Sequence, residues 1–123
     1  MIYVALTLLL WLPPQARAEN VKTIKLCENT VATASISTRG TVLEFPTEPE
    51  KVVLGTRNSF SIEYIRSDLA ISPASLSSRS NLFVYLQGRR FVLDLVSSPK
   101  SGITLYFIKD CHEDTVKAKK NGR

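Results

Sequence analysis

Short apolar segments that alternate with polar residues recur along most of the chain. The clearest runs from Ser59 to Ile65, where Phe60, Ile62 and Tyr64 fall on one face and the intervening residues on the other. A period of two residues is typical of a half-buried β-strand. The other strand candidates are Thr41–Phe45, Glu50–Leu54, Asp68–Ser72, Asn81–Gln87, Arg90–Val96 and Ile103–Lys109, with a weaker apolar segment at Val31–Ile36.

Residues that favour turns separate these segments. Gly88 and Arg89 lie between two strong strand candidates, and a two-residue connection of this kind is typical of a tight β-hairpin. Regular short strands with frequent turns indicate a sandwich or barrel, and no convincing helical period follows the first eighteen residues. The pattern predicts an all-β fold, a single small β-sandwich of about seven short strands, mostly antiparallel.

Residues 1–18 follow a different pattern. Met1 to Leu12 is a largely apolar run that is short for a membrane span, and two prolines follow it. Ala16 and Ala18 then match the small-residue positions of a secretory cleavage site. We expect a cleaved signal peptide, and hence a periplasmic or secreted protein. An uncleaved membrane anchor is the alternative.

Length and charge restrict the remaining residues. The 123 residues suffice for one domain, for which we expect bounds of 19–114, followed by a basic flexible tail at 115–123. Much of the formal net charge of +5 lies in that tail. Arg89 and Arg90, near Tyr85 and Phe91, form the one other basic and aromatic group, which a hairpin turn explains. We expect no nucleic-acid binding.

Two cysteines bracket the predicted domain. Cys27 precedes the first convincing strand and Cys111 follows the last one. In an exported protein we expect them to form a disulfide, and closing so long a loop stabilises the fold by roughly 4 kcal/mol in the chain-entropy model. A catalytic or metal-binding thiol at Cys111 is the alternative. His112 beside it is the only histidine, too few ligands for a zinc site.

Residues with catalytic potential are sparse. Nucleophilic catalysis needs an oriented base, and the single histidine lies next to the cysteine that we expect to be bridged. Glycine-rich phosphate loops, zinc spacings and calcium loops are missing from the sequence. No spacing singles out a carboxylate pair among Glu44, Glu63, Asp68 and Asp94, and at Asp94 we expect protection of a sheet edge. We predict no enzymatic activity and no cofactor.

Several segments carry a family resemblance. They are, in order, Thr41–Phe45, Lys51–Gly55, Ser59–Ile62, Ser80–Tyr85 and Arg89–Leu95. The most distinctive parts are the Asn-Leu that begins the hairpin and the return strand Arg-Arg-Phe-x-Leu-x-Leu. Together they resemble the N-terminal β-domain of the TrbG/CagX-type family, periplasmic subunits of the outer-membrane core complex in type IV secretion and conjugal transfer machines. The resemblance extends over residues 41–96.

The resemblance implies a non-enzymatic structural or assembly subunit. Its partners would be other envelope or secretion-complex subunits, or further copies of itself, and it would meet the membrane only through them. The candidate interface residues are Phe60, Tyr64, Tyr85, Arg89 and Arg90. For Phe60 and Tyr64 a place in the core is the alternative, because both lie on the apolar face of an alternating strand.

The sequence leaves two other functions open. An exported small ligand- or peptide-binding β-sandwich module would have a concave pocket lined with aromatic side chains. An envelope adaptor or pilus component of a different family would have an exposed, unpaired edge strand. Thr56 also departs from the family pattern, since an acidic residue usually follows the glycine there, and a tryptophan near Phe60 is missing.

Overall fold

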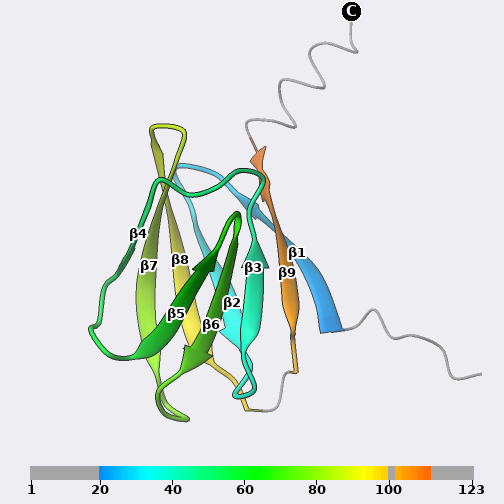
Figure 1. Ribbon diagram of the computed structural model, residues 1–123, viewed down its shortest axis with the longest axis vertical. Helices are drawn as coiled ribbons and strands as arrows, with labels where there is room; N and C mark the ends of the chain where they lie inside the picture. Colours follow the sequence, from blue (N-terminus) through cyan, green and yellow to red (C-terminus); the bar gives the residue numbers. More distant parts are fainter. Residues whose placement is uncertain (1–19, 100–101, 112–123) are drawn as a thin grey trace, which may run out of the picture.

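The computed structural model describes residues 20–99 and 102–111, and within them the chain forms nine strands in two sheets (Figure 1). The sheets lie face to face and enclose the core, so the predicted all-β, sandwich-like architecture is confirmed. The predicted signal peptide with Ala16 and Ala18, and the predicted basic tail at 115–123, lie outside the described residues. Within the described part, no helix is long and apolar enough to cross a membrane.

One sheet has five strands and the other has four. The order in the five-stranded sheet is β1 (Val21–Leu26), β9 (Leu105–Asp110), β3 (Thr41–Glu44), β6 (Asp68–Pro73) and β5 (Phe60–Ile65). The order in the four-stranded sheet is β2 (Val31–Ile36), β8 (Arg89–Ser97), β7 (Arg79–Leu86) and β4 (Lys51–Leu54).

The sheets are mixed rather than mostly antiparallel. The pairings of β1 with β9, β3 with β9 and β2 with β8 are parallel, whereas the other four pairings of the described strands are antiparallel. The parallel pairs arise because strands from the start of the chain lie beside strands from its end that run in the same direction. Such long-range pairing leaves no trace in local alternation. The seven clear strand candidates and the weaker segment Val31–Ile36 each form a strand, and β1 is the ninth strand of the described residues.

Strand β1 was missed by the sequence analysis, which placed Cys27 before the first strand. Ile24 and Leu26 of β1 face the core, while Lys22 and Lys25 are exposed. Lysines are common on edge strands because their charge discourages pairing with other chains, and they weaken the apolar signal by which a strand is recognised. The alternation of Ile24 and Leu26 with lysine was the available signal.

The core lies between the sheets and consists of the inward positions of each strand. On β8, Phe91, Leu93 and Leu95 are fully buried and alternate with outward residues. Burying a large apolar side chain of this kind stabilises a fold by about 1.5–3 kcal/mol. Thr41 is the fully buried polar residue of β3, and its hydroxyl donates to the Ile103 carbonyl at 2.8 Å while accepting from the Ser37 amide at 2.8 Å.

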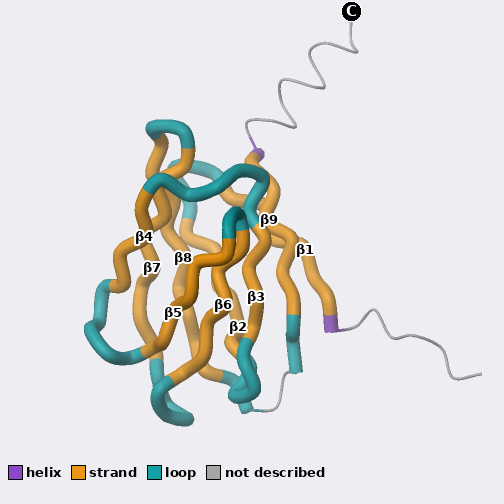
Figure 2. The backbone as a smooth tube through the Cα atoms, viewed as in Figure 1, coloured by secondary structure: helices purple, strands orange, loops and turns teal. Residues whose placement is uncertain are grey.

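The hairpin between β7 and β8 is confirmed, but its turn lies one residue earlier than predicted. Gln87 and Gly88 connect the strands, with φ angles of 47° and 77° (Figure 2). Two positive φ angles in a two-residue loop define a type I′ turn, whose twist matches that of the strands. Arg89 is therefore the first residue of β8, which fixes the direction of its side chain and of Arg90 after it.

Candidate functional site

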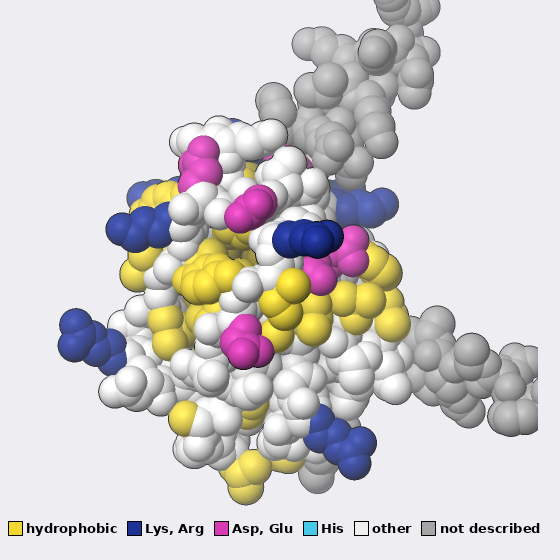
Figure 3. Space-filling view, in the orientation of Figure 1, with side chains coloured by type: hydrophobic (Ala, Val, Ile, Leu, Met, Phe, Trp, Pro, Cys, Tyr) yellow, Lys and Arg dark blue, Asp and Glu magenta, His cyan; other side chains and the backbone are white. Residues whose placement is uncertain are grey.

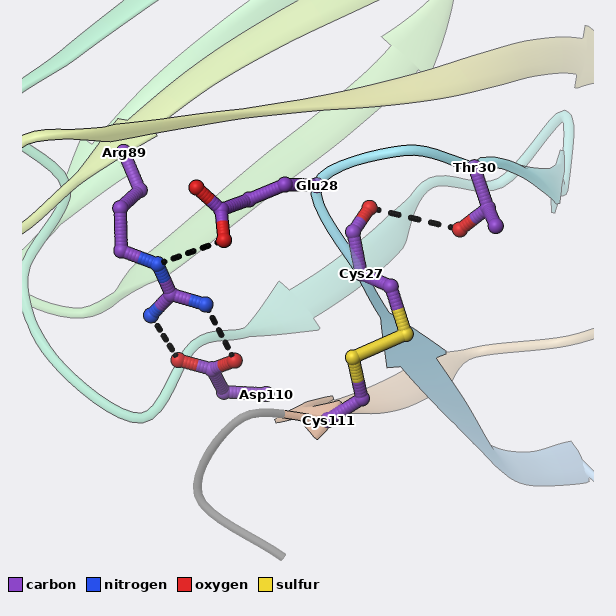
Figure 4. The surroundings of a disulfide bond; sticks show 6 residues. All are labelled: Cys27, Glu28, Thr30, Arg89, Asp110 and Cys111. Atoms are coloured by element: carbon purple, nitrogen blue, oxygen red, sulfur yellow. Dashed lines mark hydrogen bonds and ion pairs between the residues drawn. A yellow bond between two sulfur atoms is a disulfide. The ribbon is translucent and has the colours of Figure 1, made fainter. Parts of the chain in front are cut away.

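The predicted disulfide between Cys27 and Cys111 is present (Figure 4). Cys27 directly follows β1 and Cys111 directly follows β9, and the last paired residues of these parallel strands are Leu26 and Asp110. The bond therefore continues the β1–β9 pairing by one position and closes a segment with a sequence separation of 84 residues. No cysteine is free among the described residues.

Arg89 lies next to this disulfide and joins the two sheets. Its guanidinium makes a two-pronged contact with the Asp110 carboxylate at 2.6 and 2.9 Å, and its Nε lies 3.2 Å from a carboxylate oxygen of Glu28 (Figure 4). The hydrogen bonds to Asp110, with a smaller contribution from Glu28, raise the pKa of Arg89 above its ordinary value. The guanidinium also lies 4.9 Å from the centre of the Phe91 ring. These contacts give Arg89 a structural role.

Phe60 and Tyr64 have different surroundings although they share one face of β5. Phe60 is buried in the core, with 6% of its surface exposed. Tyr64 is 61% exposed, so the core alternative holds for Phe60 and is wrong for Tyr64. Tyr64 lies near the end of β5, an edge strand, and its hydroxyl donates to the Val52 carbonyl of β4, an edge strand of the opposite sheet, at 3.5 Å. Of these two aromatic residues, only Tyr64 is available to a partner.

Tyr85 and Arg90 lie opposite each other on the outer face of the four-stranded sheet. They are directly paired between β7 and β8, and Lys51 of β4 pairs with Tyr85 on its other side. Arg90 and Lys51 are exposed, and Tyr85 is half-buried. The structure thus brings these two sequence-predicted residues together, whereas neighbouring Arg89 points toward the other sheet.

Beside them, four apolar residues form one unbroken row across that outer face. Val31 pairs with Val92, Val92 with Phe83, and Phe83 with Val53, so each strand of the sheet contributes one member. Val31 is 61% exposed and Val53 is 38% exposed, while Phe83 and Val92 are half-buried. We call Val31, Val53, Phe83 and Val92 the apolar row. A contiguous apolar surface on an outer face is a candidate contact site for another protein.

The apolar row was not predicted from the sequence, although part of its signal was present. In the strand candidate Arg90–Val96 the outward positions include Val92 and Val96, which a solvated face does not require. Asp94 is a further outward residue, and it pairs with Arg79 at 3.0 Å. The expectation that Asp94 protects a sheet edge is wrong, because β8 lies between β2 and β7. It marks the polar border of the apolar row instead.

The outer face of the five-stranded sheet is more mixed. Hydrophobic side chains gather over β5, β6, β3 and β9, with acidic and basic side chains among and around them (Figure 3). Across the strands, exposed Phe107 pairs with Glu44, Glu44 with Asp68, and Asp68 with exposed Ile65. Carboxylates thus interrupt this row. Val21, Leu105, Val42 and Ala70 form a continuous apolar row next to it, but all four are half-buried. The row on the opposite side differs from it because Val31 and Val53 are exposed.

The described residues contain no cluster of histidine, cysteine or carboxylate side chains that could hold a metal ion. His112, which the sequence analysis considered beside Cys111, lies outside the described residues. Among known proteins, no family model and no curated sequence matches this chain.

Proposed function

We propose that this protein is a non-enzymatic assembly subunit of a bacterial envelope complex, and that it contacts a neighbouring subunit through the apolar row. The observation that carries the proposal is the unbroken row of Val31, Val92, Phe83 and Val53 across all four strands, on one exposed face. Aqueous solvent disfavours such a surface, because each exposed apolar side chain loses the stabilisation that burial provides. A protein partner would supply that burial.

The neighbours of the apolar row fit a protein interface. Tyr85, Arg90 and Lys51 border the row on one side, and the Arg79–Asp94 ion pair borders it on the other. Tyrosine and arginine are enriched where proteins bind one another, and a polar rim around an apolar centre is the usual organisation of such a surface. The basic border favours a partner with an acidic rim.

The proposed location, in a secretion complex of the bacterial envelope, rests on the sequence. The predicted signal peptide favours a periplasmic or secreted location, and the Cys27–Cys111 disulfide is compatible with an oxidising compartment. The resemblance of residues 41–96 to the TrbG/CagX-type family favours the core complex of a type IV secretion or conjugal transfer machine. In such a complex the protein would act by positioning other subunits, without chemistry of its own.

The test is co-purification from the envelope of the native host. The tagged protein is cross-linked in cells and its partners are identified by mass spectrometry, alongside the variants Phe83→Glu and Val53→Glu. We expect secretion-system core subunits with the native chain and at least tenfold less of them with either variant. A glutamate in a desolvated interface loses its hydration without gaining a partner, which opposes binding.

The matched control is Leu76→Glu, which adds the same charge at an apolar residue that is 67% exposed in the loop between β6 and β7. Circular dichroism and thermal unfolding of each variant establish that it is folded. Absence of secretion-system subunits from the native sample would refute the proposed setting. Equal recovery with all three variants would refute the apolar row as the contact surface.

An envelope adaptor of a different family is the second candidate function. The observation that favours it is the edge strand β5, of which five residues out of six are exposed or half-buried. Adaptors that act by strand addition present such an edge to an extended segment of their partner. In the same experiment, this function predicts that envelope proteins outside the secretion system are recovered with the native chain. Their recovery should be unchanged in Phe83→Glu and lost in variants with substitutions in β5.

A further inference from the structure

The four edge strands of the two sheets differ in how well they are protected from further pairing. β1 carries Lys22 and Lys25, and β4 carries Lys51. The backbone N–H of Ser35 on β2 donates to the Tyr106 hydroxyl at 2.9 Å, so a tyrosine of the other sheet occupies part of that edge. Lysines and covering side chains are the usual means by which proteins prevent edge-to-edge association.

Strand β5 lacks these forms of protection. Its sequence Phe-Ser-Ile-Glu-Tyr-Ile contains neither lysine nor proline, and Glu63 is its one charged residue. The amide of Ala74 donates to the Ser59 carbonyl at 2.9 Å, which defines a hydrogen-bonded pair of the β5–β6 ladder. Because such pairs alternate in an antiparallel ladder, the backbone groups of Phe60, Ile62 and Tyr64 point to the open edge.

We propose that β5 pairs with β5 of a second copy of this chain, antiparallel and across a twofold axis, so that two five-stranded sheets become one. A twofold axis makes the contact self-complementary and closed, as in most soluble homodimers. The open edge supplies N–H and C=O groups on both copies, and these groups pair with one another. This dimer uses a surface distinct from the apolar row and does not depend on the proposed function.

The side chains of β5 select one register of this pairing. With Glu63 opposite Glu63, two like charges would face each other, which is destabilising. With Ile62 opposite Ile62, Glu63 of each copy instead faces Ser61 of the other, and Phe60 faces Tyr64. The edge-directed backbone groups of Phe60, Ile62 and Tyr64 are then all paired. The register centred on Ile62 is therefore the one that combines complete pairing with no charge clash.

The first test is the molecular mass of the exported protein in solution. The protein is purified from the periplasm with its disulfide intact, and light scattering is recorded up to about 1 mM, which corresponds to a weak association. We expect a concentration-dependent monomer–dimer equilibrium that Ile62→Lys shifts at least tenfold toward the monomer. A native chain that stays monomeric throughout this range would overturn the proposal.

A second variant tests the register by strengthening the contact. Ser61→Lys places a cation opposite Glu63 of the second copy at two symmetrical positions, so we expect the dimer to become several-fold tighter. With Glu63 opposite Glu63, residue 61 would face Ile65 instead, and no such gain would follow. Because Ser61 is exposed, this variant does not disturb the core. An unchanged or weaker dimer would refute the Ile62-centred register.

Cysteine cross-linking measures the register directly. In the Ile62-centred register the two Cα atoms of residue 62 lie about 5.5 Å apart, within the range that a disulfide spans. Residue 61 of one copy is diagonal to residue 61 of the other, at about 7–8 Å, which is too far. We expect Ile62→Cys to give a covalent dimer under mild oxidation and Ser61→Cys to give none. Cross-linking through Glu63→Cys rather than Ile62→Cys would overturn the register.

Discussion

The guanidinium of Arg89 on β8 holds the carboxylate of Asp110 at the end of β9 by two hydrogen bonds, of 2.6 and 2.9 Å. The two strands belong to different sheets, so this pair fixes one sheet against the other at the end of the sandwich where Cys27 and Cys111 are bridged. Arg90, the next residue, is on the outer face. The two adjacent arginines therefore differ in role: Arg89 links the two sheets, whereas Arg90 is exposed on the outer face.

Replacing Arg89 by alanine should destabilise the protein by about 2 kcal/mol, because it removes charge-assisted hydrogen bonds and leaves Asp110 largely buried. Urea unfolding followed by circular dichroism measures the change. Arg79→Ala is the matched control, since Arg79 also pairs with an aspartate but is 69% exposed. We expect little effect from it, as for most exposed ion pairs. Equal losses in the two variants would contradict the role assigned to Arg89.

The contribution of Arg89 should not change with pH between about pH 7 and pH 10. Its pKa in the folded protein is raised by Asp110, and a raised pKa stabilises the fold at every pH below the ordinary value of arginine. Above this range, the contribution is lost as the pH rises through the raised pKa. Urea midpoints of the native chain and Arg89→Ala, measured across this range, should therefore differ by a constant amount.

The disulfide should contribute roughly 4 kcal/mol, because it restricts the unfolded chain over a sequence separation of 84 residues. The double variant Cys27→Ser, Cys111→Ser should show this loss in urea unfolding. Adding a reductant should lower the stability of the native chain to that of the variant and leave the variant unchanged. If the reductant also lowered the stability of the double variant, the loss in the native chain could not be assigned to the Cys27–Cys111 bond.

Tyr106→Phe should destabilise the fold by about 1 kcal/mol, the usual net contribution of one hydrogen bond. The hydroxyl of Tyr106 is the partner of the Ser35 amide at the edge of β2, and phenylalanine leaves that amide unpaired. Hydrogen exchange should therefore accelerate at Ser35. Tyr85→Phe serves as the control, because the hydroxyl of Tyr85 has no hydrogen-bond partner in the described part of the chain, and its removal should have little effect.

Gly88→Ala should cost about 1 kcal/mol through the backbone alone. Gly88 has a φ angle of 77°, and a Cβ atom there would meet nothing within 4 Å, so packing contributes no penalty. Gly88→Asn should cost less, since asparagine adopts positive φ more readily than alanine. Denaturant unfolding of the two variants provides the comparison, and a larger loss with asparagine would contradict a purely conformational origin.

Local pattern predicted most strands but not their partners. Alternation located β5 and the β7–β8 hairpin, because inward positions of a strand tend to be apolar and outward positions polar. The parallel pairing of β1 with β9 and of β2 with β8 depends on how distant segments meet, and nothing in either segment specifies it. The disulfide was predictable for a different reason, since two cysteines in a chain that is expected to be exported have few alternatives.

The candidate surface was predicted only in part for the same reason. Tyr85 and Arg90 stood out as an aromatic residue and a cation near one turn, and the structure places them side by side on one outer face. The apolar row draws one residue from each of four strands, so it exists only once the register is known. Phe60 and Tyr64 were indistinguishable by alternation, because a two-residue period does not show where an edge strand leaves the core.

The Cys27–Cys111 bond also determines how the domain would carry mechanical force. Strand β1, which starts at Val21, begins at one end of the sandwich, and β9, which Cys111 directly follows, ends at the other (Figure 1). Tension applied between these two points would pass along the extended backbone of β1, through the sulfur atoms, and out at Cys111. The covalent path between these points would bypass residues 28–110, so this segment would not be extended by the pull. Stretching would thus not unravel the strands that carry the apolar row and the β5 edge.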